Sequence, residues 1–362
     1  MKPIAKFLAA LISLAAWHSA PASAQEKAPV GMTKLTFEDA MRLSWDKSSN
    51  RPLVTTIWYP APPETDMMDL SFPDENPIFT GGAAAWGVPI AAEQRYPLVI
   101  LSHGTGGSGV QTMWLGRALA EAGFIAIAID HHGNTAAEAS FDPRGFRMPW
   151  HRAMDVSVVL DEIIAHAEWA PLIDQDRISM VGFSLGGYTA IALAGGRTDL
   201  DRMAQFCASD RRDGTCDPQP EYPEAEADFL ALLEGDADLM QDLEQSGRDF
   251  SDARIKKFVT LAPAVVQAFT DQSLSNISVP VLAIVGTSDR IAPAATNAER
   301  VYNRVAGADL KIIDGAGHYA FLNRCTPFGE LHVPICKDPG RARGDIHAAA
   351  MSAILAFLEP QD

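Results

Sequence analysis

Five short runs, apolar except at Ser179 and Thr260, alternate with segments of helical character along most of the chain. The runs cover residues 98–101, 125–129, 178–181, 258–261 and 281–285. A strand that is apolar at every position is buried on both faces, which is typical of parallel strands covered by helices. Strands that alternate with helices build a sheet between two helical layers. The sequence therefore predicts an α/β domain with a mostly parallel central sheet and helices on both faces.

Two segments interrupt this alternation. Residues 61–95 are rich in Gly, Pro and Ala, and we expect them to form a long surface excursion. Residues 205–252 begin polar and cysteine-bearing, and they become acidic and helical between positions 224 and 245. They fall between a helix of the sheet and the next strand, so we interpret them as a cap-like insertion over the strand ends. The alternative is a solvated excursion that takes no part in a site.

The N-terminus has the layout of a secretory signal peptide. Lys2 and Lys6 precede an apolar run over residues 7–17, and the small residues 22–24 form a cleavage pattern. The run is too short to span a bilayer comfortably, and no later segment is a membrane-spanning candidate. We predict a signal peptide over residues 1–24, a single domain over residues 25–362, and a periplasmic or secreted protein.

The chain is strongly acidic. Its formal net charge is −17, and loss of Lys2 and Lys6 with the signal peptide would bring it to −19. A surface of this charge repels nucleic acid and anionic lipid headgroups. We therefore expect no nucleic-acid partner, and a small substrate that is neutral or weakly charged.

Four cysteines are present, and export would permit disulfides between them. Four cysteines allow three pairings. We favour the two local pairs, Cys207 with Cys216 and Cys325 with Cys336, because each closes a short loop. The chain has no C-x-x-C pair, so we expect no structural zinc site.

Residues 182–186 read Gly-Phe-Ser-Leu-Gly and join the apolar strand at 178–181 to a helix of small residues. This pattern at a strand-to-helix turn forms a nucleophile elbow. The glycines leave room for neighbouring backbone at the sharp turn, and the N-terminus of the helix favours developing negative charge. Ser184 is therefore the predicted nucleophile.

A serine nucleophile needs a base, and the base needs an acid that orients it. His318 follows the last predicted strand, at residues 310–313, and Asp289 follows the strand at 281–285. Their order after Ser184 is the one that accompanies this type of elbow. The other candidates at strand ends or nearby are Asp271, Asp314, His103, His131 and His132.

An oxyanion site needs two backbone N–H donors. One is expected from Leu185, directly after the nucleophile, and the other from the glycine-rich loop at residues 102–107, where we choose Thr105. That loop lacks the pattern of a phosphate-binding or dinucleotide-binding loop. The adjacent His131 and His132 would diverge, and the aspartates of residues 210–217 lack regular calcium-ligand spacing. We therefore expect no metal and no cofactor.

With these residues in place, the chain resembles the bacterial dienelactone-hydrolase-like and platelet-activating-factor acetylhydrolase-like serine esterases of the α/β-hydrolase superfamily. The matching segments are residues 53–60, 102–104, 130–134, 182–187, 261–264, 286–289 and 315–318. The resemblance implies an α/β-hydrolase fold, a triad of Ser184, Asp289 and His318, and oxyanion donors at Leu185 and Thr105. True dienelactone hydrolases have cysteine at the elbow, so the family name does not indicate this chain's substrate.

The resemblance implies an exported serine carboxylic-ester hydrolase that acts on small or short-acyl esters through an acyl-enzyme intermediate. A phospholipase A2-type acetylhydrolase acting on short or oxidised acyl chains, or a peptidase, would use the same three residues. A non-catalytic binding protein on this fold is the alternative from another class, and it would be expected to lack a triad member.

Overall fold

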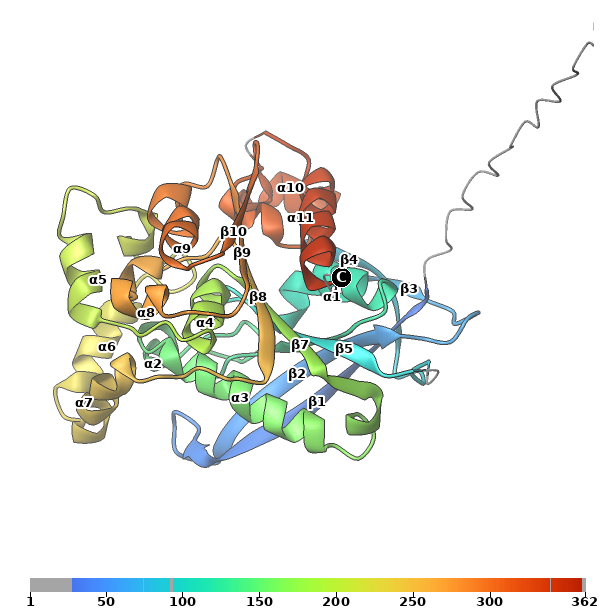
Figure 1. Cartoon of the computed structure of the whole chain (residues 1–362), viewed down its shortest axis with the longest axis horizontal. Coiled ribbons are helices and arrows are strands. Elements are labelled where there is room, and N and C mark those ends of the chain that lie inside the picture. The colour runs from blue at the N-terminus through green and yellow to red at the C-terminus, as the bar shows by residue number, and fades with distance from the viewer. Residues whose placement is uncertain (1–27, 74, 92–93, 339, 360–362) are drawn as a thin grey trace, which may run out of the picture.

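The computed structural model describes residues 28–359, apart from 74, 92–93 and 339. The predicted signal peptide lies outside these described residues. A twisted sheet runs through the middle of the molecule, with α3 (Trp150–Ala165) and α4 (Leu185–Leu193) on one side and α1 (Met113–Glu121) and α11 (Arg343–Leu358) on the other (Figure 1). The prediction of an α/β fold with helices on both faces of the sheet is confirmed.

The described strands are β1 (Val30–Leu43), β2 (Asn50–Pro60), β3 (Met68–Phe72), β4 (Phe79–Trp86), β5 (Tyr96–Ser102), β6 (Ile125–Ile129), β7 (Ile173–Phe183), β8 (Ile255–Leu261), β9 (Val281–Gly286), β10 (Asp309–Ile313) and β11 (Arg324–Cys325). The remaining α-helices are α2 (Pro143–Arg147), α5 (Leu200–Cys207), α6 (Ala225–Leu233), α7 (Ala237–Glu244), α8 (Asp271–Ser275), α9 (Ala298–Arg304) and α10 (Pro327–His332).

The parallel part of the sheet has the strand order β10-β9-β8-β7-β5-β6. An antiparallel strand, β2, pairs with β6, and β1 continues the sheet beyond it. Because parallel strands end at the same edge, the segments that follow β5, β7, β9 and β10 meet at one end of the sheet. These are the segments in which the sequence places the candidate site residues.

The expectation of an irregular excursion over residues 61–95 is wrong in part. The segment contains β3 and β4, which pair with each other, and β4 also pairs with β1 and β11. The small residues of β4 allow it to pack closely against α1. A Cβ built on Gly81 would lie 2.2 Å from Sδ of Met113 in that helix. Glycine therefore permits the close approach of β4 to the helix.

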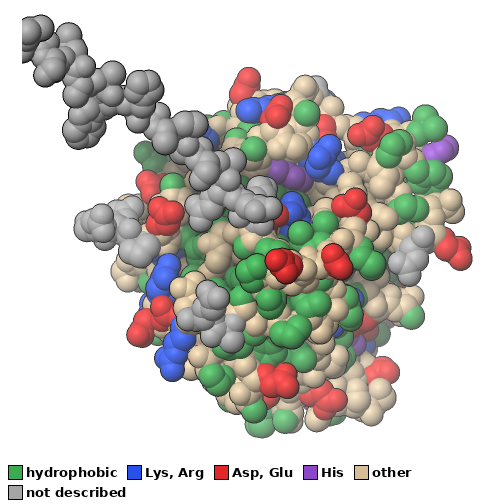
Figure 2. Space-filling model, turned by 90° about the vertical axis from the view of Figure 1, so that its right-hand side faces the viewer, with side chains coloured by type: hydrophobic (Ala, Val, Ile, Leu, Met, Phe, Trp, Pro, Cys, Tyr) green, Lys and Arg blue, Asp and Glu red, His purple; other side chains and the backbone are tan. Residues whose placement is uncertain are grey.

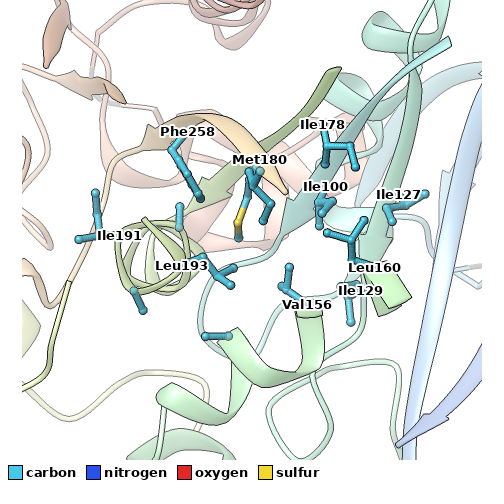
Figure 3. Close-up of a cluster of buried hydrophobic side chains, with 14 of the residues drawn as sticks. Ile100, Ile127, Ile129, Val156, Leu160, Ile178, Met180, Ile191, Leu193 and Phe258 are labelled. Atoms are coloured by element: carbon cyan, nitrogen blue, oxygen red, sulfur yellow. The ribbon is translucent and has the colours of Figure 1, made fainter. Parts of the chain in front are cut away.

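The core lies in two apolar layers, one on each face of the sheet. In the first layer, side chains of the strands meet those of α3 and α4, as Figure 3 shows for Ile100, Met180, Val156 and Ile191. The second layer packs α1 and α11 against the opposite face. These layers hold the strand ends, and the loops that follow them, in a fixed arrangement.

Residues 205–252 hold the end of α5 together with α6 and α7, on the left in Figure 1. The single helical stretch expected between positions 224 and 245 is two helices. The Asp236 side chain accepts a hydrogen bond from the Leu239 amide (3.0 Å) and so caps the start of α7. Both local disulfides, Cys207–Cys216 and Cys325–Cys336, are present in the structure.

The surface shown in Figure 2 mixes hydrophobic, acidic and basic side chains. Lysine and arginine side chains are dispersed over that face rather than gathered in one patch. This face therefore lacks the concentrated basic surface that typically attracts nucleic acid. No helix in the described part of the chain is long and apolar enough to cross a membrane.

Candidate active site

Ser184 occupies a sharp turn between β7 and α4. Its backbone has φ 54° and ψ −115°, a region that a residue with a side chain adopts only where the surroundings enforce it. The surroundings are tight, because a Cβ on Gly186 would lie 2.0 Å from the Ser102 carbonyl oxygen. The Ser184 amide donates to the Leu261 carbonyl (2.9 Å), which ties the turn to β8. The turn presents the Ser184 hydroxyl at the end of the sheet.

His318 and Asp289 meet Ser184 at this point. Nε2 of His318 lies 2.9 Å from Oγ of Ser184, and Nδ1 of His318 lies 2.8 Å from Oδ2 of Asp289. The other carboxylate oxygen of Asp289 accepts hydrogen bonds from the amides of Ile291 (3.0 Å) and Ala292 (2.8 Å). Asp289 is thereby held in one orientation, and it can fix the tautomer of His318 in which Nε2 accepts the serine proton.

The alternative acids and bases lie elsewhere. Asp271 pairs with arginines of the helical layer, including Arg300, and Asp314 accepts from the Thr287 hydroxyl (3.1 Å). The two adjacent histidines diverge. His131 contacts Ser102 and Asp155, whereas His132 contacts Glu138 and the backbone around Trp45. Within the described residues, none of these groups is hydrogen-bonded to Ser184.

The two predicted oxyanion donors, Leu185 and Thr105, line the same cavity as Ser184. Leu185 begins α4, so its amide has no carbonyl within the helix to bond to. Thr105 belongs to the loop that follows β5, at the same end of the sheet as Ser184. The loop approaches closely at Gly104, where a Cβ would lie 3.1 Å from Cβ of Ser184. No acceptor among the described residues takes a hydrogen bond from either amide.

A cavity of about 440 Å³ opens at Ser184. Most of its wall is apolar or aromatic, and it comes from α4, α5, α6 and the segment after β8. The lining side chains include Tyr188, Met203, Phe229, Val265 and Ala268. Pockets of a few hundred Å³ with apolar walls and few polar groups are typical of small-molecule sites.

The insertion supplies one side of this cavity. Cys207 and Cys216 both line it, so the disulfide is part of the wall. Between them, Asp213 accepts hydrogen bonds from Thr296 and from Gln267 (2.8 Å), in the segments that follow β9 and β8. The loop closed by the disulfide is thus fastened to the body of the domain beside the segment that carries Asp289.

Two charged residues of α3, which the sequence analysis did not identify, lie buried behind the site. Asp155 accepts hydrogen bonds from Nε of Arg51 (2.8 Å) and from Arg42 (2.7 Å). Burial opposes ionisation of its carboxyl, but the arginines Arg51 and Arg42 hold its pKa well below the usual value. Arg152 donates to the loop that contains Thr105, through the carbonyls of His103 and Gly104.

A signal for these two residues exists in the sequence. Arg152 and Asp155 continue the apolar stripe of α3 that runs through Val156 and Val159, so they lie on its buried face. A charged residue on a buried stripe needs a compensating partner.

Glu221 of the insertion has no such signal in the sequence. Its pKa is raised by burial, its Oε1 lies 3.5 Å from the Tyr319 hydroxyl, and its Oε2 has no partner among the described residues.

Buried histidines predict a steep loss of stability in weak acid. Burial lowers the pKa of His347 to about 3 and that of His131 to about 4, whereas the unfolded chain binds these protons near pH 6.5. Between these values the unfolded state carries more protons, so the free energy of unfolding falls as pH drops below about 6.5. The slope is about 1 kcal/mol per pH unit for each such histidine.

Urea unfolding of the parent, His347→Gln and His332→Gln proteins between pH 7 and 5 tests this. His347 contacts the carbonyls of Ala320 and Leu322 at 3.0 and 2.9 Å, and a glutamine side chain at this position can still donate to them. We expect a shallower pH slope in this variant. His332 is exposed, so His332→Gln should keep the parent slope. Equal slopes for His347→Gln and the parent would contradict the prediction.

Comparison with known proteins adds to this geometry. A family model described as "Alpha/beta hydrolase family" matches residues 99–328. The chain is 34% identical over 120 residues to "Uncharacterized protein YcjY" of Escherichia coli (strain K12), a match that covers 32% of this chain and 37% of that protein. It is 34% identical over 107 residues to "Cutinase 2" of Thermobifida cellulosilytica, a match that covers 29% of this chain and 37% of that protein.

A longer match, to "Cutinase 1" of the same organism, has 24% identity over 230 residues and covers 62% of this chain and 61% of that protein. The matches to the first relatives thus span little more than a third of their length. Among solved structures, a ferulic acid esterase from Streptomyces cinnamoneus superposes with a TM-score of 0.60. That superposition covers 94% of this chain and 91% of the esterase at 21% identity, which supports the shared fold.

Proposed function

Because the chain belongs to the alpha/beta hydrolase family, we propose that it is an exported serine hydrolase that cleaves carboxylic esters. The observation that carries the proposal is the chain of hydrogen bonds from Asp289 through His318 to Ser184, at the mouth of an apolar cavity. The similarity to a cutinase and to a ferulic acid esterase also supports an ester as the substrate.

The proposed reaction has two steps. Oγ of Ser184 attacks the ester carbonyl carbon while Nε2 of His318 takes the hydroxyl proton, and the amides of Leu185 and Thr105 bind the oxyanion. The tetrahedral intermediate collapses, the C–O bond to the alcohol breaks, and His318 gives its proton to the leaving oxygen. Water then attacks the acyl-enzyme with His318 as base, and the acid is released from Ser184.

Two further features belong to the proposal. The disulfides Cys207–Cys216 and Cys325–Cys336 favour an oxidising compartment, which supports a periplasmic or secreted location. The segments that resemble dienelactone-hydrolase-like and acetylhydrolase-like esterases support a place in that branch of the superfamily.

The cavity suits the acyl half of the substrate. His318 must protonate the leaving alcohol, so the alcohol lies beside His318 and the acyl group lies away from it. Thr105, Ser184 and Leu185 border the cavity, whereas His318 is not among the described residues that line it. A water-sized group takes up about 30 Å³. The cavity therefore admits small and short acyl groups, and it has room for a medium chain or one aromatic ring.

A panel of p-nitrophenyl esters with acetyl, butanoyl, octanoyl and benzoyl groups tests the proposal, alongside a short-chain phospholipid and a peptide amide. We expect hydrolysis of the esters by the parent protein. Activity confined to the phospholipid or to the peptide would replace the carboxylesterase proposal with one of those activities. A folded protein without activity on any of them would contradict a catalytic role.

Filling the cavity should change the preference among acyl groups. Ala204 of α5 lines the cavity and is exposed, so Ala204→Phe adds bulk there without a cost in the core. We expect kcat/KM for the octanoyl ester to fall by about 10-fold or more relative to the acetyl ester, since each excluded CH₂ group forfeits about 0.8 kcal/mol. The ratio of the two kcat/KM values is the measurement.

Gln205→Phe is the matched control. Gln205 is the next residue of the same helix, is exposed, and is not among the described lining residues. The control should keep the parent's ratio of octanoyl to acetyl kcat/KM. The same ratio in Ala204→Phe and the parent would show that the acyl group binds elsewhere.

A further inference from the structure

Arg152 is a buried cation whose hydrogen bonds all go to one loop. It is 1% exposed, and none of the described carboxylates forms an ion pair with it. Its Nη1 donates to the His103 carbonyl (2.7 Å), its Nη2 lies 3.2 Å from the Gly104 carbonyl, and its Nε has no partner in the described part of the chain. Burial lowers its pKa to about 9, a sign of how costly this placement is.

The neighbouring arginines behave differently. Arg51 and Arg42 both pair directly with Asp155, so the carboxylate of this cluster is already engaged. Arg152 lies one helical turn from Asp155 but directs both terminal nitrogens toward the loop instead. A locally expensive arrangement of this kind is expected where a protein maintains a functional geometry.

The Gly104 carbonyl oxygen accepts hydrogen bonds from three donors. Besides Arg152, it has Nδ1 of His103 at 2.7 Å and the Gly107 amide at 3.2 Å. Burial, together with the charge of Arg152, holds the pKa of His103 well below its usual value, so the ring is neutral. Nε2 of His103 accepts from the His131 amide (3.2 Å), which places the ring proton on Nδ1. Nδ1 lies 2.7 Å from the Gly104 oxygen, to which it donates, and 3.2 Å from Nη2 of Arg152.

This carbonyl belongs to the same peptide unit as the Thr105 amide. In a trans peptide the C=O and N–H bonds point in opposite directions. Donors that fix the Gly104 oxygen on the buried side therefore turn the Thr105 N–H toward the cavity side, where Ser184 lies. Hydrogen bonds accepted by a carbonyl also polarise the peptide and make its N–H a stronger donor.

We propose that Arg152 is a positioning residue for the oxyanion site: with His103, it orients and polarises the peptide between Gly104 and Thr105 so that the Thr105 N–H stabilises the tetrahedral intermediate. This inference rests on the proposed ester hydrolysis at Ser184. Arg152, in the buried face of α3, would then act on the chemical step rather than on substrate binding.

Three replacements at one position test the proposal. Arg152→Met keeps the length and removes the donors, Arg152→Gln keeps donors without charge, and Arg152→Lys keeps the charge. We expect kcat for p-nitrophenyl butyrate to fall about 10- to 100-fold in Arg152→Met, with KM within about 3-fold of the parent. Arg152→Lys should recover at least part of this loss. The Ki of an alkyl boronic acid, whose tetrahedral adduct needs the same amide, should rise in step with the loss in kcat.

Arg343→Met is the matched control. Arg343 is also buried, and it donates to the carbonyls of Asn323 and Ile335, away from the loop. It should lose thermal stability and keep kcat. A folded Arg152→Met protein with kcat within about 2-fold of the parent would overturn the proposal, as would a loss confined to KM, or a loss of kcat in Arg343→Met as large as that in Arg152→Met.

If all three variants at position 152 fail to fold, Arg152 serves folding and the proposal is overturned. Failure of the proposed function has a separate signature. In that case the parent itself would lack ester hydrolysis, whereas failure of this inference alone leaves the parent active and the Arg152→Met variant equally active.

Discussion

Replacement of Ser184 by alanine is expected to lower kcat for p-nitrophenyl butyrate by about 10⁴-fold or more, because it removes the attacking oxygen. The fold should be unaffected. Alanine is smaller than serine, so it fits the strained turn. The amide of residue 184 can still donate its hydrogen bond to the Leu261 carbonyl. The measurement is the steady-state rate together with the thermal midpoint of purified parent and variant.

Ser179→Ala is the control for this substitution. Ser179 is in the strand β7 that leads to Ser184 and is also buried, but the side-chain hydrogen bonds of His318 go to Ser184 and Asp289. It should keep the parent rate to within about 2-fold. A Ser184→Ala protein that retains more than about 1% of the parent rate would refute the assignment of Ser184 as nucleophile.

Asp289→Asn is expected to lower kcat by about 10³- to 10⁴-fold near neutral pH. The amide oxygen can still accept from Ile291 and Ala292, so the side chain should stay in place. Its NH₂ group then faces Nδ1 of His318 and favours the tautomer whose proton lies on Nε2, toward Ser184. A histidine in that tautomer cannot accept the serine proton.

The companion variant is Asp314→Asn. Asp314 is the nearest acid to His318 in sequence, but its carboxylate accepts from the Thr287 hydroxyl instead. It should retain at least about half of the parent rate. A large loss in Asp314→Asn with a small loss in Asp289→Asn would reverse the assignment of the acid.

Most of the parallel half of the fold could be predicted because β5, β6, β7, β8 and β9 each contain a short run that is almost entirely apolar. The strands β3 and β4 could not be predicted, and the physical reason differs between the two. β3 is mostly exposed, so it has no apolar run, and β4 is built from glycine and alanine that resemble a loop in sequence. Only the contact of Gly81 with Met113 explains why small residues are needed there.

The predicted site residues follow strands whose ends meet, which is why chain order and turn chemistry could indicate that Ser184, Asp289 and His318 lie together. The role of Arg152 behind the loop at residues 102–107 could not be predicted in the same way. Arg152 lies within an apolar stripe, and its significance depends on which carbonyls it reaches across the fold. Glu221 approaches the site only because the insertion folds back over it, and no local pattern encodes that path.

The most direct test of the proposed mechanism is covalent labelling with an alkyl fluorophosphonate, followed by mass spectrometry of the digested protein. We predict one adduct per chain, located on Ser184, with ester hydrolysis lost in proportion to labelling. A folded protein that hydrolyses esters but carries the adduct on another residue, or that stays unlabelled, would contradict the central claim.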